Sequence, residues 1–231
     1  MDIENHELPQ GDEKRTAVRD MFDAIAPRYD LVNRIMTFGM DLRWRRNAQR
    51  SLDLAPGSVV LDLAAGTGDF SVTLARAGHN PIAVDLSYGM LAAARTSEPR
   101  VQGDLLSLPM ASGSVDGAVC GFALRNLVSL DPFFTELNRV LRSGGRIALL
   151  DVSQPDNALV RLGHSFYFNK AVPVIGGLLS DRSAYAYLPR SVSYLPEPAT
   201  MMSKLEAAGL IDVERRQLSG GIAQLLTARR P

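Results

Sequence analysis

The chain has 231 residues, of which 46% are hydrophobic and 22% are charged, so it is long enough for one large α/β domain with a sizeable core. Its 25 basic and 25 acidic residues give a net charge of zero, which disfavours a nucleic acid as partner. The single cysteine, Cys120, excludes a disulfide framework, and no cluster of metal ligands is evident, so we expect no bound metal. No apolar run approaches the roughly 18 residues of a membrane span, and the N-terminus is unlike a signal peptide, so we expect a cytoplasmic protein.

The N-terminal part of the chain is polar at first and then rich in apolar and aromatic residues. Residues 1–13 are predicted from their composition to be disordered, and residues 14–231 to form a single domain. A helix capped by Thr16 is expected to end at Pro27. Aromatic residues, methionines and arginines are dense over residues 14–52, before any strand begins.

This N-terminal segment has two interpretations. Its amphipathic helices can simply cap the sheet. Alternatively, residues 14–52 form a lid over a bound cofactor, with Tyr29 and Asp30 pointing into the site. In that case an apolar mouth is formed by Met36, Phe38, Met40 and Trp44. The neighbouring arginines are expected to be solvated: Arg43, Arg45 and Arg46.

Residues 59–70 are the most informative stretch of the chain. An apolar run, a turn of small residues and a helical pattern follow one another, which predicts a buried strand, a tight turn and a helix. Gly66 and Gly68 in the turn allow a ligand to approach the backbone. The dinucleotide fingerprint G-x-G-x-x-G fits poorly, because Ala64 and Asp69 stand at its first and third glycines.

Carboxylates follow the expected strands at the same relative position. Asp62 and Asp69 flank the glycine turn, and Asp85 and Asp104 follow the next two strands. In an open α/β sheet these positions converge on the crevice at the carboxyl ends of the strands. Several carboxylates there would repel a pyrophosphate, but they complement the ammonium and sulfonium groups of S-adenosylmethionine.

Each of these positions has a predicted role in binding S-adenosylmethionine. Asp85 lies about 20 residues past the turn, within reach of both ribose hydroxyls. Asp104 is placed to accept from the adenine amino group, and Asp62 to hold the methionine ammonium directly or through water. Leu86 and Met90 are expected to sandwich the adenine. Together these features predict a class I S-adenosylmethionine-dependent methyltransferase: an α/β fold with a Rossmann-like sheet and helices on both faces.

The remainder of the chain completes the sheet. Residues 115–122 form the fourth strand, expected beside the first at the topological switch point. Arg125 and Asn126 follow that strand, directly above the methyl donor.

The last third departs from a simple alternation of strands and helices. A helix over 131–141 should end at a glycine stop before the strand 146–152. The aromatic insertion 155–197 forms either extra core or a wall for a large apolar substrate. The strands 211–218 and 222–228 are expected to close the sheet as an antiparallel hairpin.

Two motifs are more specific than the glycine turn. Arg28-Tyr29-Asp30-Leu31-Val32-Asn33 lies in the N-terminal segment, and Leu124-Arg125-Asn126 follows the fourth strand. With the segments 61–69, 185–188 and 218–223, they make the chain resemble the bacterial ubiquinone/menaquinone biosynthesis C-methyltransferases over most of its length.

The resemblance implies methylation of a ring carbon of a polyprenylated quinol, with demethylmenaquinol as the expected substrate and menaquinol as the product. A 2-polyprenyl-6-methoxy-benzoquinol of the ubiquinone pathway and a soluble phenolic metabolite stay as alternatives. It also implies that Thr67, Asp85 and the pair Gly103-Asp104 bind the cofactor. Gly121 is a further expected cofactor contact, although the family usually has serine there, and the sequence after Ile222 departs from the family pattern as well.

The substrate defines the chemistry that the site must perform. A quinol ring carbon is nucleophilic only while its neighbouring hydroxyl loses its proton. Arg125 is expected to stabilise the developing oxyanion and Asn126 to orient it. The base that removes the ring proton could be a water, Tyr29, Asp30 or His164; the sequence leaves these alternatives open.

Because a polyprenyl tail lies in a bilayer, we expect peripheral contact with the inner face of the membrane; a homodimer is compatible with the sequence. A non-catalytic binding module is disfavoured by the intact acidic positions.

Overall fold

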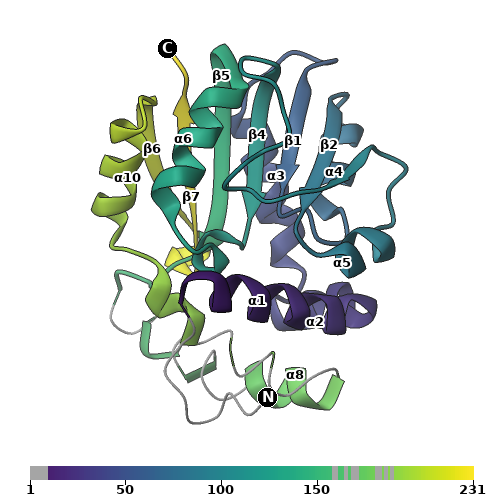
Figure 1. Ribbon diagram of the computed structural model, residues 1–231. Helices are drawn as coiled ribbons and strands as arrows, with labels where there is room; N and C mark the ends of the chain where they lie inside the picture. The colour runs from purple at the N-terminus through teal and green to yellow at the C-terminus, as the bar shows by residue number, and fades with distance from the viewer. Residues whose placement is uncertain are drawn as a thin grey trace.

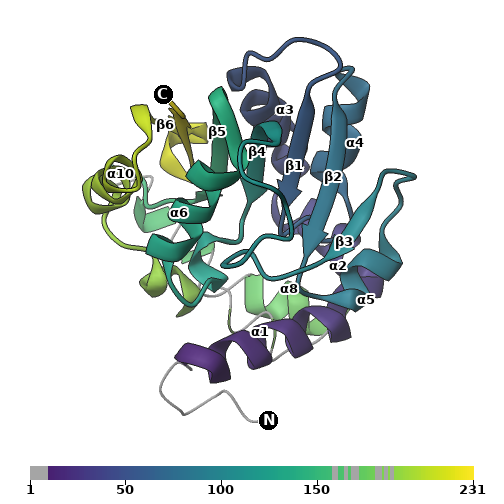
Figure 2. The same ribbon diagram turned by 45° about the horizontal axis from the view of Figure 1, so that its top comes forward.

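The computed structural model describes residues 10–157, 161–163, 166–167, 172–179, 184, 187 and 190–231. Within these residues, seven strands form one sheet in the order β3-β2-β1-β4-β5-β7-β6 (Figures 1 and 2). The strands are β1 (Val59–Leu63), β2 (Asn80–Asp85), β3 (Arg100–Gln102), β4 (Val115–Gly121), β5 (Leu141–Val152), β6 (Ile211–Leu218) and β7 (Ala223–Arg229). β1 to β5 are parallel, and β7 is antiparallel to β5 and β6. The predicted sheet and its C-terminal hairpin are confirmed.

The central strand, β1, is apolar on both faces of the sheet. Leu61 and Leu63 are fully buried on one face, and Val60 is fully buried on the other. β4 pairs directly with β1, as the sequence predicts. The loops that follow these two strands therefore meet at the topological switch point, where ligands bind in such sheets.

Helices cover both faces of the sheet (Figure 2). One face is covered by α3 (Met40–Ser51) and α4 (Asp69–Arg76), and the other by α6 (Leu130–Val140) and α10 (Pro198–Ala207). The buried side chains under α3 and α4 include Trp44, Ala48, Leu52, Phe70 and Leu74. Those under α6 and α10 include Phe133, Phe134, Leu137, Met201 and Leu205.

The helix after β2 begins at a serine cap. The hydroxyl oxygen of Ser87 accepts a hydrogen bond from the backbone N–H of Met90 at 3.0 Å, and α5 (Tyr88–Ala93) follows. This bond satisfies one of the unpaired N–H groups of the first turn and fixes the end of the β2 loop.

The N-terminal helices lie across the carboxyl ends of the strands (Figure 1). They are α1 (Gly11–Ile25) and α2 (Tyr29–Met36), joined by the 3₁₀ turn Ala26–Arg28. Pro27 stands in this turn, so the first helix ends close to where proline predicts it. We call α1, α2 and α3 together the lid.

The lid begins earlier in the chain than the sequence predicts. α1 starts at Gly11 and not at a cap formed by Thr16, so residues 11–13 are helical and not disordered. Asp12 and Glu13 stand in the first turn, where acidic side chains interact favourably with the helix dipole. The other residues expected to be disordered, 1–9, lie outside the described part.

The connection between α6 and β5 also differs from the prediction. The helix ends at Val140 and β5 begins at Leu141, which pairs with Val115 of β4. Gly144 and Gly145 therefore lie inside the strand and do not stop the helix. Pairing with β4 makes the chain extended before the glycines are reached.

The aromatic insertion is described only in part. Its helix α8 (Val172–Leu179) contacts α2 below the lid in the view of Figure 1. The 3₁₀ turn Val192–Tyr194 leads toward α10. His164, one of the possible bases, lies outside the described residues. None of the described helices has the length and apolar character needed to cross a membrane.

Candidate active site

Two adjoining cavities lie between the lid and the carboxyl ends of the strands. The larger has a volume of about 340 Å³ and the smaller about 100 Å³. Three aromatic side chains line both of them: Phe22, Tyr29 and Phe122. A group held in one cavity can therefore face a group held in the other across this aromatic boundary.

The smaller cavity contains the strand-end groups that the sequence predicts for adenosine binding. Asp85 lines it and accepts hydrogen bonds from the backbone N–H groups of Gly66 and Ser87, each at 2.8 Å. Burial raises the pKa of Asp85, and these backbone bonds oppose the rise. A carboxylate has several lone-pair sites, so both oxygens keep acceptor capacity for ribose hydroxyls. Leu86 and Met90 line the same cavity and supply its apolar walls.

Asp104 also lines the smaller cavity, where it has a partner from the lid. One carboxylate oxygen accepts from the backbone N–H of Leu106 at 2.9 Å, and the other from Arg15 of α1 at 3.2 Å.

Gly121 lines the cavity too, and a Cβ atom there would lie 2.8 Å from the Phe70 ring. The packing of Phe70 thus explains why this chain has glycine at that position. These residues suit an adenosine with two hydroxyls and an amino group.

Four predicted cofactor-binding residues do not line the smaller cavity. The hydroxyl of Thr67 donates to Asp30, and a Cβ atom at Gly68 would lie 2.8 Å from Thr96. A Cβ atom at Gly103 would approach Pro109 to 3.2 Å. These three residues shape the loops around the cavity. The fourth is Asp62.

Asp62 is buried beneath α4 and away from both cavities. Its Oδ2 accepts from the backbone N–H and the hydroxyl of Ser71, each at 2.7 Å. Burial raises the pKa of Asp62 to about 7, although the bonds from Ser71 oppose the rise. Successive side chains of a strand point to opposite faces, so Asp62 shares the α4 face with Val60.

Arg125 and Asn126 lie on opposite sides of the aromatic boundary. They belong to the 3₁₀ turn Leu124–Asn126 after β4. Arg125 lines the larger cavity and Asn126 the smaller one. The hydroxyl of Tyr187 donates to the Asn126 side-chain oxygen at 3.4 Å. The sequence therefore locates both residues correctly at the switch point.

The Arg125 guanidinium is fixed by a buried carboxylate that the sequence analysis did not single out. Its Nη1 donates to Asp151 at 2.5 Å and its Nε to Ser191 at 3.2 Å. Asp151 is fully buried and also accepts from the backbone N–H groups of Leu124 and Val152. Its place at the end of β5, the next strand along the sheet, is the signal that indicates a role beside Arg125.

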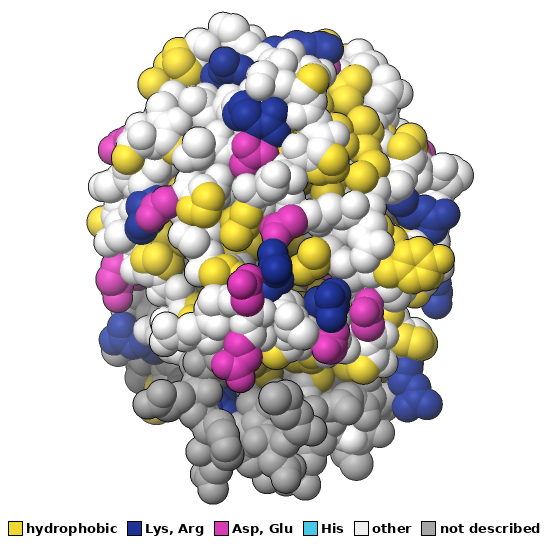
Figure 3. Space-filling view, viewed as in Figure 1, with side chains coloured by type: hydrophobic (Ala, Val, Ile, Leu, Met, Phe, Trp, Pro, Cys, Tyr) yellow, Lys and Arg dark blue, Asp and Glu magenta, His cyan; other side chains and the backbone are white. Residues whose placement is uncertain are grey.

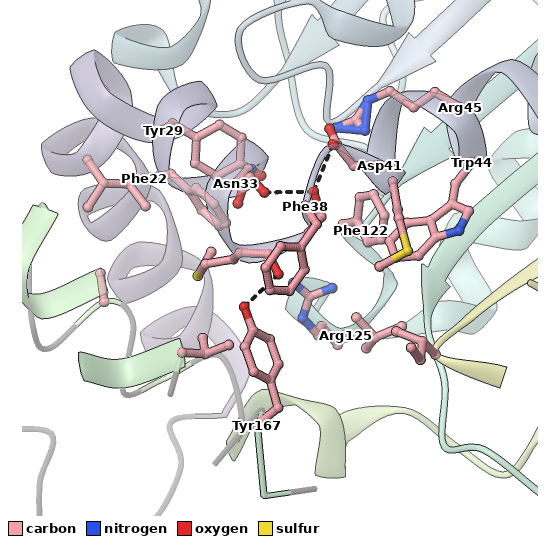
Figure 4. Close-up of a pocket in the computed structure, with 18 of the residues that line it drawn as sticks. Phe22, Tyr29, Asn33, Phe38, Asp41, Trp44, Arg45, Phe122, Arg125 and Tyr167 are labelled. Carbon is pink, nitrogen blue, oxygen red and sulfur yellow. Dashed lines mark hydrogen bonds between the residues drawn. The ribbon is translucent and has the colours of Figure 1, made fainter. Parts of the chain in front are cut away.

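The larger cavity has the apolar mouth that the lid interpretation predicts. Figure 4 shows Tyr29, Phe38, Trp44, Phe122 and Tyr167 around it. Met36 and Met40 line it as well. Asp30, in contrast, lines neither cavity, because its carboxylate accepts from Thr67 and so connects α2 to the glycine turn.

Arg45 is buried, although the sequence analysis expects it to be solvated. It is 6% exposed and lines the larger cavity, with its guanidinium 5.4 Å from the Phe70 ring centre and 5.3 Å from that of Phe122. The spacing of Asp41, Trp44, Arg45 and Ala48 is the signal that was missed, since these positions share one face of α3.

The sheet order, the glycine turn at the switch point and the acid-lined cavity define a class I S-adenosylmethionine-dependent methyltransferase. A phosphoethanolamine N-methyltransferase of Haemonchus contortus, solved with S-adenosyl-L-methionine, has a similar fold. The TM-score is 0.61 at 14% identity, over 93% of this chain and 60% of that one. The chain belongs to the ubiE/COQ5 methyltransferase family, whose sequence model matches residues 10–230.

Named relatives cover nearly the whole chain. A ubiquinone/menaquinone biosynthesis C-methyltransferase of Syntrophotalea carbinolica is 41% identical, over 92% of this chain and 93% of the relative. A demethylmenaquinone methyltransferase of Mycolicibacterium vanbaalenii is also 41% identical, over 91% of this chain and 93% of the relative. The protein is thus a methyltransferase with S-adenosylmethionine as the methyl donor.

Proposed function

We propose that this enzyme methylates a ring carbon of demethylmenaquinol to give menaquinol. One observation carries the proposal: a cavity of about 340 Å³ with largely apolar walls adjoins the acid-lined cavity that suits the donor. An aromatic ring with a hydrocarbon tail suits such walls, whereas a polar metabolite would leave polar groups unpaired there. The names of the two relatives support the same substrate class.

Arg125 has the environment that oxyanion stabilisation requires. When bound, S-adenosylmethionine supplies an electrophilic methyl group. Arg125 is 5% exposed, and Asp151 and Ser191 hold its guanidinium at the wall of the larger cavity. It has more N–H groups than these two partners use, so it can donate to the quinol oxygen as negative charge develops. Asn126, on the donor side, orients the ring.

Tyr29 is better suited to position the ring than to remove its proton as a phenolate. Burial raises the pKa of its phenol, and the nearby charge of Arg45 opposes the rise only in part. The hydroxyl therefore stays protonated near neutral pH and can hold the substrate by a hydrogen bond. Because Asp30 lines neither cavity, we assign removal of the ring proton to a water molecule.

The lid offers a surface for peripheral contact with a bilayer. Large apolar side chains are exposed on it: Leu31 and Ile35 on α2, Phe38 in the following turn and Leu42 on α3. Phe38 is 76% exposed and also lines the larger cavity. A prenyl tail in the bilayer would then reach the cavity without crossing water.

A comparison of three acceptor substrates tests the proposed function. Purified enzyme is given S-adenosylmethionine with demethylmenaquinol, the same naphthoquinol without its tail, or a polyprenylated benzoquinol. We expect the largest kcat/KM for demethylmenaquinol, and a loss of about 10-fold or more on tail removal, since each buried methylene contributes about 0.8 kcal/mol. Equal kcat/KM with and without the tail would favour a soluble phenolic substrate instead. A larger kcat/KM for the benzoquinol would move the enzyme to the ubiquinone pathway.

A further inference from the structure

Arg45 is a buried cation with too few partners. Its Nε and Nη1 atoms are buried and have no hydrogen-bond acceptor among the residues that the structure describes. Its Nη2 lies 3.8 Å from Asp69, which is longer than a hydrogen bond, and the other oxygen of Asp69 accepts from Arg34 at 2.7 Å. The aromatic faces of Phe70 and Phe122 offer attraction to the charge, but they do not replace directional acceptors.

Such an arrangement is costly unless a ligand completes it. A buried N–H group without an acceptor loses its bonds to water and gains nothing in return, and the loss is larger for a charged group. Arg45 lines the larger cavity, and in Figure 4 its side chain runs from α3 toward the interior of the site. A ligand in that cavity therefore lies against the Arg45 side chain.

The position of Arg45 indicates which ligand oxygen this is. Arg45 lies beside Asp69 and Phe70, the first residues of α4, directly after the glycine turn. Its charge also acts on Tyr29, which lines both cavities. An adenosine beside Asp85 and Met90 in the smaller cavity would direct the amino-acid end of the donor past Gly66 toward the N-terminus of α4, where the larger cavity lined by Arg45 adjoins.

The amino-acid end of the donor carries an ammonium and an α-carboxylate, which need partners of opposite charge. Asp62, the predicted partner of the ammonium, is engaged by Ser71 and lines neither cavity, whereas Arg45 has the charge that suits the carboxylate. We propose that Arg45 binds the α-carboxylate of S-adenosylmethionine through its unpaired N–H groups. The α-carboxylate carries a full negative charge, and arginine is well suited to bind a carboxylate in a water-poor site.

The test compares two ligands in the same variants. S-Adenosylhomocysteine carries the α-carboxylate, whereas 5′-methylthioadenosine lacks the whole amino-acid end. Both are titrated calorimetrically into the wild type, Arg45→Met and Arg45→Lys. Arg46→Met is the matched control, because Arg46 is the exposed neighbour on the same helix and donates to the Leu42 carbonyl.

We expect Arg45→Met to weaken S-adenosylhomocysteine binding by about 10- to 100-fold, the effect of losing a charge-assisted hydrogen bond. Binding of 5′-methylthioadenosine should stay within about 2-fold of the wild type, which also shows that the variant is folded. Arg45→Lys should recover part of the affinity, and Arg46→Met should change neither ligand.

Equal weakening of both ligands, or no weakening of either, would overturn the assignment. Unchanged donor affinity with a large loss of quinol turnover would overturn it too. That result would indicate that the unpaired N–H groups bind the substrate oxygen. The binding arm uses only the donor, so its result does not depend on whether demethylmenaquinol is the acceptor.

Discussion

Asp62 shows at the scale of one residue how strand alternation decides what a carboxylate can do. A position at the end of β1 suggests a ligand contact, yet the pleat directs this side chain under α4, where Ser71 donates two hydrogen bonds to it. Burial raises its pKa from 3.8 to about 7. Asp62 is therefore a titrating group of the core, and its effect on stability depends on pH.

The sign of that dependence follows from proton binding. Between about pH 4 and pH 7 the native state keeps the proton of Asp62 and the unfolded state has released it, so the native state binds more protons. The contribution of Asp62 to the free energy of unfolding is fully present below about pH 4 and is lost as pH rises toward 7. Asp62→Asn removes the titration. We expect the free energy of unfolding of the wild type, relative to Asp62→Asn, to fall by up to about 1.4 kcal/mol per pH unit across this window.

Urea unfolding at half-unit steps from pH 4.5 to pH 8 measures this difference. The exposed Asp20→Asn variant serves as the control, because its carboxylate is on the surface of α1. If the free energies of unfolding of the wild type and Asp62→Asn differ by the same amount over the whole pH range, the assignment of a raised pKa to Asp62 is refuted.

The lid is the element that joins the two parts of the site. It contacts the loop after each of the strands β1 to β4. The contacts are Lys14 to Leu127, Arg15 to Asp104, Asp23 to Ser87, Asp30 to Thr67 and Arg34 to Asp69. Every loop that forms the smaller cavity is thus held by the element that also forms the mouth of the larger one.

On the outside of the lid, acidic and basic side chains of α1 lie next to one another (Figure 3). Arg19 pairs with Asp20, for example, and Arg15 with Asp12. The exposed apolar side chains of the lid lie farther along, on α2, on α3 and in the turn between them. If the proposed bilayer contact is made through the lid, we therefore expect it on α2 and α3 and not on α1.

Leu31→Asp tests this assignment, because Leu31 is 58% exposed and lines neither cavity. We expect its binding to vesicles of mixed zwitterionic and anionic lipid to fall by about 10-fold or more, since burying a leucine contributes about 1.5–3 kcal/mol and a charge opposes insertion. Donor affinity should not change. Ile211→Asp, on the distant edge strand β6, should bind vesicles like the wild type; undiminished binding of Leu31→Asp would exclude the lid as the contact.

At the scale of the whole molecule, features set by local patterns were predictable from the sequence. The apolar run before the glycine turn indicates β1, Ser87 caps α5, and the last two strands form the hairpin. Leu86, Met90, Arg125 and Asn126 line the cavities because strand ends converge in this fold.

Features set by packing between distant segments were not predictable in the same way. The start of α1 is one case, since buried Lys14 bonds to Leu127 across the lid. Arg45 is another: its spacing on α3 indicated burial, but its contacts with Phe70 and Phe122 depend on where α3 lies. Asp151 gains its role only when β5 pairs beside β4 and brings it to Arg125.

The central claim is that a nucleophilic quinol ring receives the methyl group. The most direct measurement is transfer of labelled methyl from S-adenosylmethionine to reduced demethylmenaquinone in detergent, with the oxidised quinone as the control. We predict labelled menaquinol from the quinol and none from the quinone, because only the quinol can lose a hydroxyl proton to activate its ring carbon. Equal labelling of the quinone, or no product in a sample shown to bind the donor, would contradict the account.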